Sequence, residues 1–297
     1  MTSPYAAAIE RWYAANARDL PWREPAATPW SILVSEVMLQ QTPVSRVLPA
    51  HQAWLERWPE PAALATASPA DAVRQWQRLG YPRRALRLHA SAGIISAGHG
   101  GQVPDTIEQL RRLPGVGPYT AAAIASFAFG QRHAVLDTNV RRVLTRLRAG
   151  ADRPALAPTA AEVRLAESLL PPDGRQAARW SVGVMELGAL VCTATRPQCP
   201  SCPLAGQCAW LALGRPAGPP RRTQARYDGS DRQCRGRLLA VLRAADGQIP
   251  ASALEAAWAD VPQRARSLAG LITDGLVTAS ADGTFALAGD QAPGRHD

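Results

Sequence analysis

Apolar residues recur at helical spacing along most of the chain, and prolines and glycines interrupt the pattern. An amphipathic helix is predicted over residues 4–17, and an apolar helix from Thr28 to Pro43, with proline in its first turn and after its end. Further helices are predicted near residues 119–129, 140–148, 159–170 and 174–190. The pattern therefore predicts a mostly α-helical fold.

Two predicted helices flank the glycine-containing turn 113–117, LPGVG, and this arrangement is typical of a helix-hairpin-helix. Asp105 is the expected N-cap of the first helix, which spans residues 106–112. The glycines let the backbone approach a ligand, and the second helix offers free N–H groups to an anion. This turn is therefore predicted to bind a phosphate.

An apolar run over residues 133–136 leads to Asp137, at the start of the basic helix 140–148. An Asp at this position is either a functional carboxylate or an ordinary N-cap. The helix bears Arg141, Arg142, Arg146 and Arg148, which face either phosphates or solvent.

Glu36 and Glu186 each lie inside an apolar run of a predicted helix. On a helical wheel, Ile32, Leu33 and Leu39 flank Glu36, so apolar surroundings would raise its pKa and suit it to general-acid catalysis. The alternative is that Glu36 points at solvent beside Gln40, and the helix alone does not decide between the two.

Composition narrows the function. A chain of 297 residues with 46% hydrophobic residues suggests one large or two modest domains, and no apolar run approaches the ~20 residues of a membrane helix. No secretory signal is visible, so a cytoplasmic location is expected. The net charge of +9 favours a polyanionic partner such as nucleic acid. Since every basic residue is arginine, no lysine can form a Schiff base with an opened sugar.

Four cysteines, Cys192, Cys199, Cys202 and Cys208, follow one another with the spacing C-x6-C-x2-C-x5-C. Without a secretory signal, this clustering indicates metal ligation rather than disulfide bonds. Zinc and a [4Fe–4S] cluster both remain open. Cys234 lies outside the group and is interpreted as a packed or free thiol.

Together the motifs resemble the adenine DNA glycosylases of the MutY type, within the helix-hairpin-helix glycosylases related to endonuclease III. The resemblance covers Trp12 to Ala209. It is carried by SEVMLQQT (35–42), LGYPRRALRLH (79–89), LPGVGPYTAAA (113–123), VLDTNVRRVL (135–144), MELGALVCT (185–193) and the cysteine spacing. Thr138 departs from the pattern, because many relatives have glycine there.

The resemblance implies a role for each matching residue. It makes Glu36 the acid that protonates adenine and assists water, and Asp137, supported by Asn139, the carboxylate that stabilises the sugar cation. Their apolar and polar settings, respectively, are expected to hold different protonation states. Tyr119 stands where the lyase branch has its lysine. Four further residues match those around the flipped adenine: Arg18, Leu20, Trp22 and Glu186. Four match those that enter the duplex near the opposite base, Gln41, Thr42, Leu79 and Tyr81, and the hairpin residues Gly115, Val116 and Gly117 are also expected to bind DNA. The four clustered cysteines match the ligands of a [4Fe–4S] cluster.

The implied activity is hydrolysis of the bond between adenine and deoxyribose, opposite 8-oxoguanine or guanine, by a monofunctional, monomeric enzyme acting on duplex DNA of the nucleoid. The alternatives are a mismatch thymine or uracil glycosylase on the same scaffold, an endonuclease III-like lyase, and a non-catalytic DNA-binding protein with a structural metal. Glu36 within SEVMLQQT argues against the first, and Tyr119 and the absence of lysine against the second.

The chain is predicted to consist of a catalytic region, 1–213, with its cluster loop at 192–208, a linker, 214–230, a module, 231–290, and a tail, 291–297. The Nudix-like pattern that follows the catalytic region in many relatives is not recognisable here. Three short helices, 235–244, 251–258 and 263–274, and a hairpin over 277–287 around Asp282-Gly283 instead suggest a winged-helix-like module. Its role is either DNA contact or packing.

Overall fold

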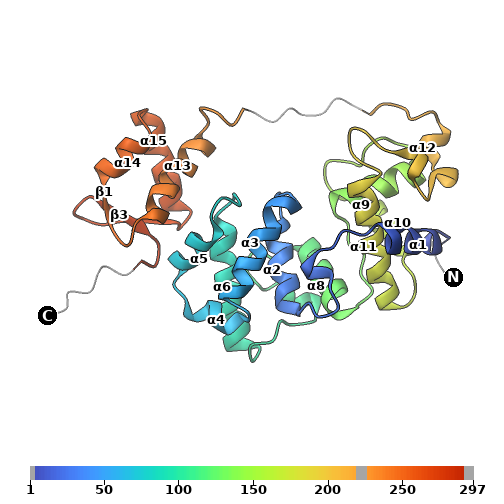
Figure 1. The fold of residues 1–297 in the computed structure, drawn as a ribbon, viewed down its shortest axis with the longest axis horizontal. Helices are drawn as coiled ribbons and strands as arrows, with labels where there is room; N and C mark the ends of the chain where they lie inside the picture. Colours follow the sequence, from blue (N-terminus) through green and yellow to red (C-terminus); the bar gives the residue numbers. More distant parts are fainter. Residues whose placement is uncertain (1–3, 219–225, 291–297) are drawn as a thin grey trace. The chain divides into compact units, whose positions relative to one another are not determined.

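The computed structural model describes residues 4–218 and 226–290, and it is mostly α-helical, as predicted (Figure 1). The helices are α1 (Ala6–Asn16), α2 (Pro29–Leu39), α3 (Val44–Arg57), α4 (Pro61–Thr66), α5 (Pro69–Trp76), α6 (Arg83–Gly98), α7 (Ile107–Leu110), α8 (Pro118–Phe129), α9 (Thr138–Leu144), α10 (Ala160–Leu169), α11 (Gly174–Leu190), α12 (Ala209–Ala212), α13 (Asp231–Ala244), α14 (Ala251–Ala257) and α15 (Val261–Thr273). Short helical turns are η1 (Pro21–Arg23), η2 (Thr145–Ala149), η3 (Cys199–Ser201) and η4 (Ala205–Gln207). In the described part of the chain, no helix is both long and apolar enough to cross a membrane.

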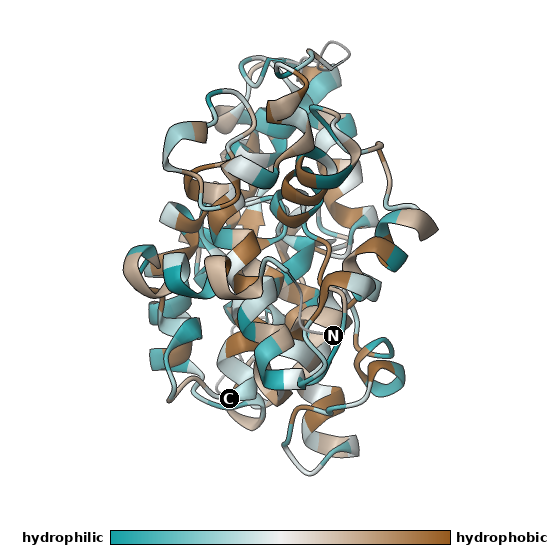
Figure 2. Ribbon diagram, turned by 90° about the vertical axis from the view of Figure 1, so that its right-hand side faces the viewer, coloured by the Kyte–Doolittle hydropathy of each residue, from teal (hydrophilic) through white to brown (hydrophobic). Residues whose placement is uncertain are grey.

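The described residues form two compact units that interleave along the sequence. One contains residues 4–36, 105–112 and 116–218, and the other contains residues 37–104, 113–115 and 226–290. Most helices carry apolar and polar residues side by side (Figure 2), as expected for helices with one buried face. The boundaries predicted from the sequence stay predictions; part of the linker, 219–225, and the tail lie outside the described residues.

The first unit brings the N-terminal helix α1 against α11, with Ile9 and Leu187 in its apolar core. Helix α11 also packs against α9, whose Val140 and Val143 enter the same core. A Cβ atom added at Gly188 would lie 2.7 Å from the Cβ of Asn139, so only glycine permits this close approach of the two helices.

The second unit is built on α6, which packs against α4 and α5. Trp54, Trp58 and Trp76 are buried there, and the Trp54 ring meets the other two edge to face, at 4.6 and 5.6 Å between ring centres. Such pairs stabilise the core beyond the area they bury.

Within the second unit, residues 226–290 contain α13, α14 and α15 and a three-stranded antiparallel sheet. The strands are β1 (Ile249–Pro250), β2 (Val277–Ala279) and β3 (Thr284–Leu287), in the order β1-β3-β2. The predicted hairpin is present, with Gly283 at φ 81° in its turn. Strand β1 was not predicted, because two residues carry no alternation.

One local prediction was wrong, and the basic helix is present but not α-helical throughout. The N-cap of α7 is Thr106, whose hydroxyl accepts from the Gln109 N–H, and not Asp105. The basic helix is α-helical only to Leu144 and continues as a single π-helical turn, η2. The sequence carries no signal for such a turn.

Candidate active site

Glu36 lies in α2, a helix with buried residues on every side, and it is only 6% exposed. This decides between the two sequence interpretations, because the side chain does not face solvent. Burial, followed by the charge of Asp137, raises the pKa of Glu36 to about 7; the Tyr119 hydroxyl and the charge of Arg23 oppose the shift. A carboxyl group with this pKa can hold a proton near neutral pH and give it up.

Asp137 caps α9. One of its carboxylate oxygens accepts from the Val140 N–H at 2.6 Å, and the other accepts from the Asn139 side chain at 2.7 Å. Burial raises the pKa of Asp137, against the lowering effect of these hydrogen bonds. Asp137 is therefore an N-cap and also an electrostatic neighbour of Glu36. The polar setting expected for Asp137 from the sequence is present in these hydrogen bonds, but burial also acts on its pKa.

Tyr119 stands in the first turn of α8, after Gly117 and Pro118 at the helix start. Its hydroxyl is hydrogen-bonded to Glu36. Burial, with the charges of Glu36 and Asp137, raises the pKa of Tyr119 well above its ordinary value, so the hydroxyl stays protonated. It can therefore donate to the Glu36 carboxylate.

A chain of hydrogen bonds leads from Asp137 towards the cysteine loop. The Arg142 guanidinium donates to the Asn139 side-chain oxygen at 2.8 Å, to the Gly188 carbonyl at 2.7 Å and to the Cys192 carbonyl at 2.7 Å. Arg142 thus ties the start of α9 to the end of α11.

The other basic side chains after Asp137 also have partners inside the protein. Arg141 pairs with Glu162, Arg146 pairs with Asp152, and Arg148 donates to the Tyr5 hydroxyl. Neither the phosphate-facing nor the solvent-facing interpretation holds for Arg141 and Arg146, which are buried.

Glu186 is completely buried on α11 and binds two arginines. The Arg18 guanidinium donates to both carboxylate oxygens at 2.7 Å, and the Arg23 guanidinium lies 2.9 Å from one of them. Burial alone would raise the pKa of Glu186, but Arg18 and Arg23 together lower it to about 2. The structure gathers Arg18 and Glu186, as predicted, and the neighbouring Leu20 and Trp22 are buried.

Sequence reasoning missed Arg23, whose charge also acts on Glu36. A signal existed: a carboxylate in an apolar helix either takes up a proton or needs a cation beside it, and Arg23 directly follows Trp22.

Gln41, Thr42, Leu79 and Tyr81 belong to the second unit. Gln41 and Tyr81 are exposed, Tyr81 by 48%, and both adopt left-handed backbone conformations. Thr42 and Leu79 are buried, and the Thr42 hydroxyl donates to the Leu79 carbonyl at 3.2 Å. Only two of these four side chains are therefore exposed at the surface.

The hairpin turn leads from α7 to α8. Gly115 has φ 84°, which favours glycine, and Val116 is buried. Gly117 is exposed and has open space where a Cβ would lie, so its backbone is accessible to a ligand.

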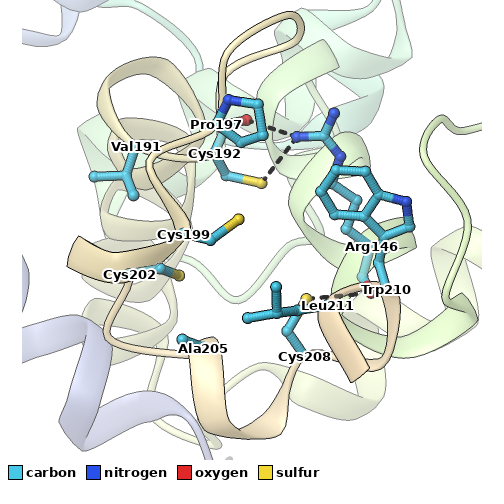
Figure 3. A pocket seen from close by; sticks show the side chains of 10 residues that line it. All are labelled: Arg146, Val191, Cys192, Pro197, Cys199, Cys202, Ala205, Cys208, Trp210 and Leu211. Atoms are coloured by element: carbon cyan, nitrogen blue, oxygen red, sulfur yellow. Dashed lines mark hydrogen bonds between the residues drawn. The ribbon is translucent and has the colours of Figure 1, made fainter. Parts of the chain in front are cut away.

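Cys192, Cys199, Cys202 and Cys208 line one pocket, into which their sulfur atoms point (Figure 3). The Arg146 guanidinium donates to the Cys192 sulfur at 3.4 Å and lies 4.3 Å from the centre of the Trp210 ring. Burial raises the pKa of Cys192, and that of Cys202 to about 11. Among the described residues, no three His, Cys, Asp or Glu side chains form a group that could hold a single metal ion.

Comparison with known proteins relates this geometry to a family. Residues 34–169 match the model of the HhH-GPD superfamily base excision DNA repair proteins. An adenine DNA glycosylase of Mycobacterium tuberculosis is 54% identical over 94% of this chain and 92% of its own length. One from Mycolicibacterium smegmatis is 50% identical, over 96% of each chain.

Among solved structures, a thermostable thymine-DNA glycosylase superposes with a TM-score of 0.64 at 27% identity, over 70% of this chain and 95% of that one. The fold is thus shared more widely than the sequence of the adenine-specific relatives. The chain belongs to the base excision repair glycosylases of the HhH-GPD superfamily and, within them, to the adenine DNA glycosylases.

Proposed function

We propose that this chain hydrolyses the N-glycosidic bond of adenine mispaired with 8-oxoguanine or guanine in double-stranded DNA, as a monofunctional enzyme that acts as a monomer in the cytoplasm. The observation that carries the proposal is the pair formed by Glu36, which is buried, and Asp137, which is half-buried and whose charge acts on Glu36. Breaking this bond needs a proton on the departing base and negative charge beside the developing sugar cation. These two side chains supply both.

In the proposed reaction, protonated Glu36 gives its proton to a ring nitrogen of adenine. The bond between this base and the sugar C1′ then breaks, and its electron pair leaves with the base. Asp137 stabilises the sugar cation, and Asn139 and the Val140 N–H orient its carboxylate. A water molecule adds to C1′ and passes a proton to the Glu36 carboxylate, which restores the acid.

The adenine must first leave the base stack. In the proposal, the exposed side chains of Gln41 and Tyr81 enter the duplex, and the turns that contain Thr42 and Leu79 support them. The Gly115–Gly117 backbone binds a phosphate. Arg18, Leu20, Trp22 and Glu186 shape the pocket for adenine, with Glu186 holding the Arg18 guanidinium in place.

The four clustered cysteines fit a [4Fe–4S] cluster, because their sulfurs converge on one pocket from a single loop. Such a cluster would link the four thiolates and fix the loop against Arg146 and Trp210. A brown protein that absorbs near ~400 nm would support it, and a colourless protein with stoichiometric zinc would refute it.

A thymine or uracil glycosylase is the main alternative, since a thymine-DNA glycosylase shares the fold. The higher identity to adenine DNA glycosylases, together with Glu36 in SEVMLQQT, favours adenine. A non-catalytic DNA-binding protein would leave the raised pKa of Glu36 without a role.

The substrate is tested with duplexes that carry A:8-oxoguanine, A:guanine, T:guanine or U:guanine, incubated with the protein and then cleaved with alkali. Release of adenine alone is expected. Release only from T:guanine or U:guanine would overturn the proposal, and equal rates on the two adenine duplexes would remove the preference for 8-oxoguanine.

The assigned roles are tested with Glu36→Gln and Asp137→Asn. Each variant is expected to bind the mispaired duplex as the wild type does but to release no adenine in a single turnover. Excision at the wild-type rate by either variant would exclude the role given to that residue.

A further inference from the structure

Arg84 lies in the first turn of α6 and is only 5% exposed. One nitrogen of its guanidinium donates to the carbonyls of Val37 and Met38, each at 2.8 Å. The other nitrogen donates to the Thr42 hydroxyl at 2.8 Å and to the Gly80 carbonyl at 3.0 Å. A single side chain thus joins the end of α2, the turn after it and the turn before α6.

Backbone carbonyls, rather than a carboxylate, surround the Arg84 charge in the described structure. Two of them belong to the last turn of α2, where the helix dipole is negative and favours a cation. Burial lowers the pKa of Arg84 to about 10, so the guanidinium is still charged at neutral pH. A planar fork with several donors is needed to reach all of these acceptors at once.

The two turns that Arg84 joins are strained. Gln41 has φ 55° and Tyr81 has φ 47°, values in the left-handed region that residues with a side chain rarely adopt. Such conformations persist where the surrounding structure enforces them, and they concentrate at functional sites. Both strained residues carry exposed side chains, and the Tyr81 ring centre lies 5.6 Å from the Arg84 guanidinium carbon.

We propose that Arg84 is a positioning residue that clamps the Gln41 turn and the Tyr81 turn together in the conformation that enters the duplex. The proposal rests on the proposed function, because that function requires an adenine to leave the stack. Because both turns are already ordered before DNA binds, the step in which the base leaves the stack does not include the loss of their conformational entropy.

Arg243 provides a matched comparison within the same unit. It is half-buried, and loss of solvent around its guanidinium lowers its pKa to about 10, as for Arg84. Its guanidinium donates to one carbonyl, that of Val73 at 2.9 Å, and in the described structure it does not bridge the two turns. Replacing Arg243 therefore tests the loss of a desolvated arginine that donates to a backbone carbonyl, without the loss of the clamp.

The experiment compares full-length wild type, Arg84→Met, Arg84→Lys and Arg243→Met on an A:8-oxoguanine duplex with 2-aminopurine beside the adenine. Stopped-flow fluorescence measures opening of the stack, and single-turnover excision measures chemistry. The burst amplitude counts active molecules, so a loss of folded protein is separated from a change in rate. In a second duplex, called the gapped duplex, the base opposite the adenine is missing. The adenine of this duplex is already partly unstacked.

For Arg84→Met, we expect opening and excision to slow by about 10- to 100-fold per active molecule, as for the loss of hydrogen bonds from a charged donor. The rates of Arg84→Lys are expected to lie between those of Arg84→Met and the wild type, since lysine keeps the charge but lacks the planar guanidinium with its several donors. On the gapped duplex, Arg84→Met should slow opening and excision less, because the adenine is already partly unstacked. Arg243→Met should lower only the burst amplitude or the thermal midpoint.

Wild-type opening by Arg84→Met, or equal slowing by Arg243→Met, would overturn the clamp. If Arg84→Met does not fold, Thr42→Val replaces it, because this variant removes one bridging hydroxyl; unchanged opening would then decide against the proposal. A wild type that releases no adenine would refute the proposed function instead, and the fluorescence step would still rank the variants.

Discussion

Glu36 and Glu186 are both buried, yet the protein shifts their pKa values in opposite directions. Among the described residues, Glu36 forms no ion pair with an arginine, and burial and the charge of Asp137 outweigh the charge of Arg23 and raise the pKa of Glu36 to about 7. Two arginines bind Glu186 and lower its pKa to about 2, although burial alone would raise it. At the residue scale, the difference between a carboxyl group that holds a proton near neutral pH and one that stays charged is therefore an ion pair with a guanidinium.

The raised pKa of Glu36 makes a prediction about stability. Its pKa is about 7 when folded and about 4.5 when unfolded, so the folded state binds the proton more tightly. Stability contributed by this group is present below the unfolded value and is lost as pH rises through about 7. Glu36→Gln removes the buried charge and should raise stability by on the order of 3 kcal/mol near pH 8, and by almost nothing near pH 4.

Thermal unfolding of both proteins at the two pH values measures this difference. Single-turnover excision by the wild type should also fall as pH rises through about 7, because the protonated acid is lost. A stabilisation that is equal at both pH values would contradict the assigned pKa.

At the scale of elements, the position of Asp137 depends on how closely helices α9 and α11 approach. Gly188 of α11 faces Asn139 of α9, and a Cβ at Gly188 would lie 2.7 Å from the Asn139 Cβ and 2.9 Å from the Asn139 carbonyl oxygen. Asn139 in turn holds Asp137. A single methyl group would therefore separate the helices at the point where the active site is supported.

Gly188→Ala tests this contact. Overpacking at this contact should lower the free energy of unfolding by about 1–3 kcal/mol. The single-turnover rate per active molecule should also fall, because Asn139 and Asp137 move. Gly93→Ala in α6 is the matched control, since a Cβ there meets nothing within 4 Å and should be neutral or stabilising. A normal excision rate for Gly188→Ala would show that Asp137 tolerates the shift.

For the whole molecule, the positive charge is concentrated in one part of the sequence. Residues 4–218 contain 23 arginines and 15 acidic residues, whereas residues 226–290 contain seven and eight. The three helices and the hairpin of this second segment have the pattern of a winged-helix module, but residues 226–290 carry no excess of basic over acidic residues. This charge balance favours packing over DNA contact, the two roles that the sequence pattern left open.

The salt dependence of duplex binding tests this distribution. Arg111→Gln or Arg112→Gln, exposed beside the hairpin, should each reduce the slope of log affinity against log salt by about one. Arg237→Gln, equally exposed on α13, should leave the slope unchanged. A reduction for Arg237→Gln as large as for Arg111→Gln would assign DNA contact to the C-terminal segment.

Prediction from sequence was best for the helices, because their apolar periodicity is local. The pattern predicted α2, α8, α10 and α11 to within a few residues. It was worse where an element ends through contacts made elsewhere, as at the π-helical turn η2, whose Arg146 is held by Asp152 and the Thr193 carbonyl.

By itself, the sequence determined the helical fold, the hairpin and the cysteine spacing, because each follows from residue types at short spacing. The roles of Glu36 and Asp137 came from the resemblance to a family and stay predictions. Only the tertiary structure decided that Glu36 is buried, that Arg23 joins Arg18 on Glu186, and that Arg84 links two strained turns. These depend on contacts between residues far apart in the chain, such as Arg18 and Glu186, which are 168 positions apart. Local periodicity carries no information about such pairs, so the charge environment of each site could be determined only from the folded chain.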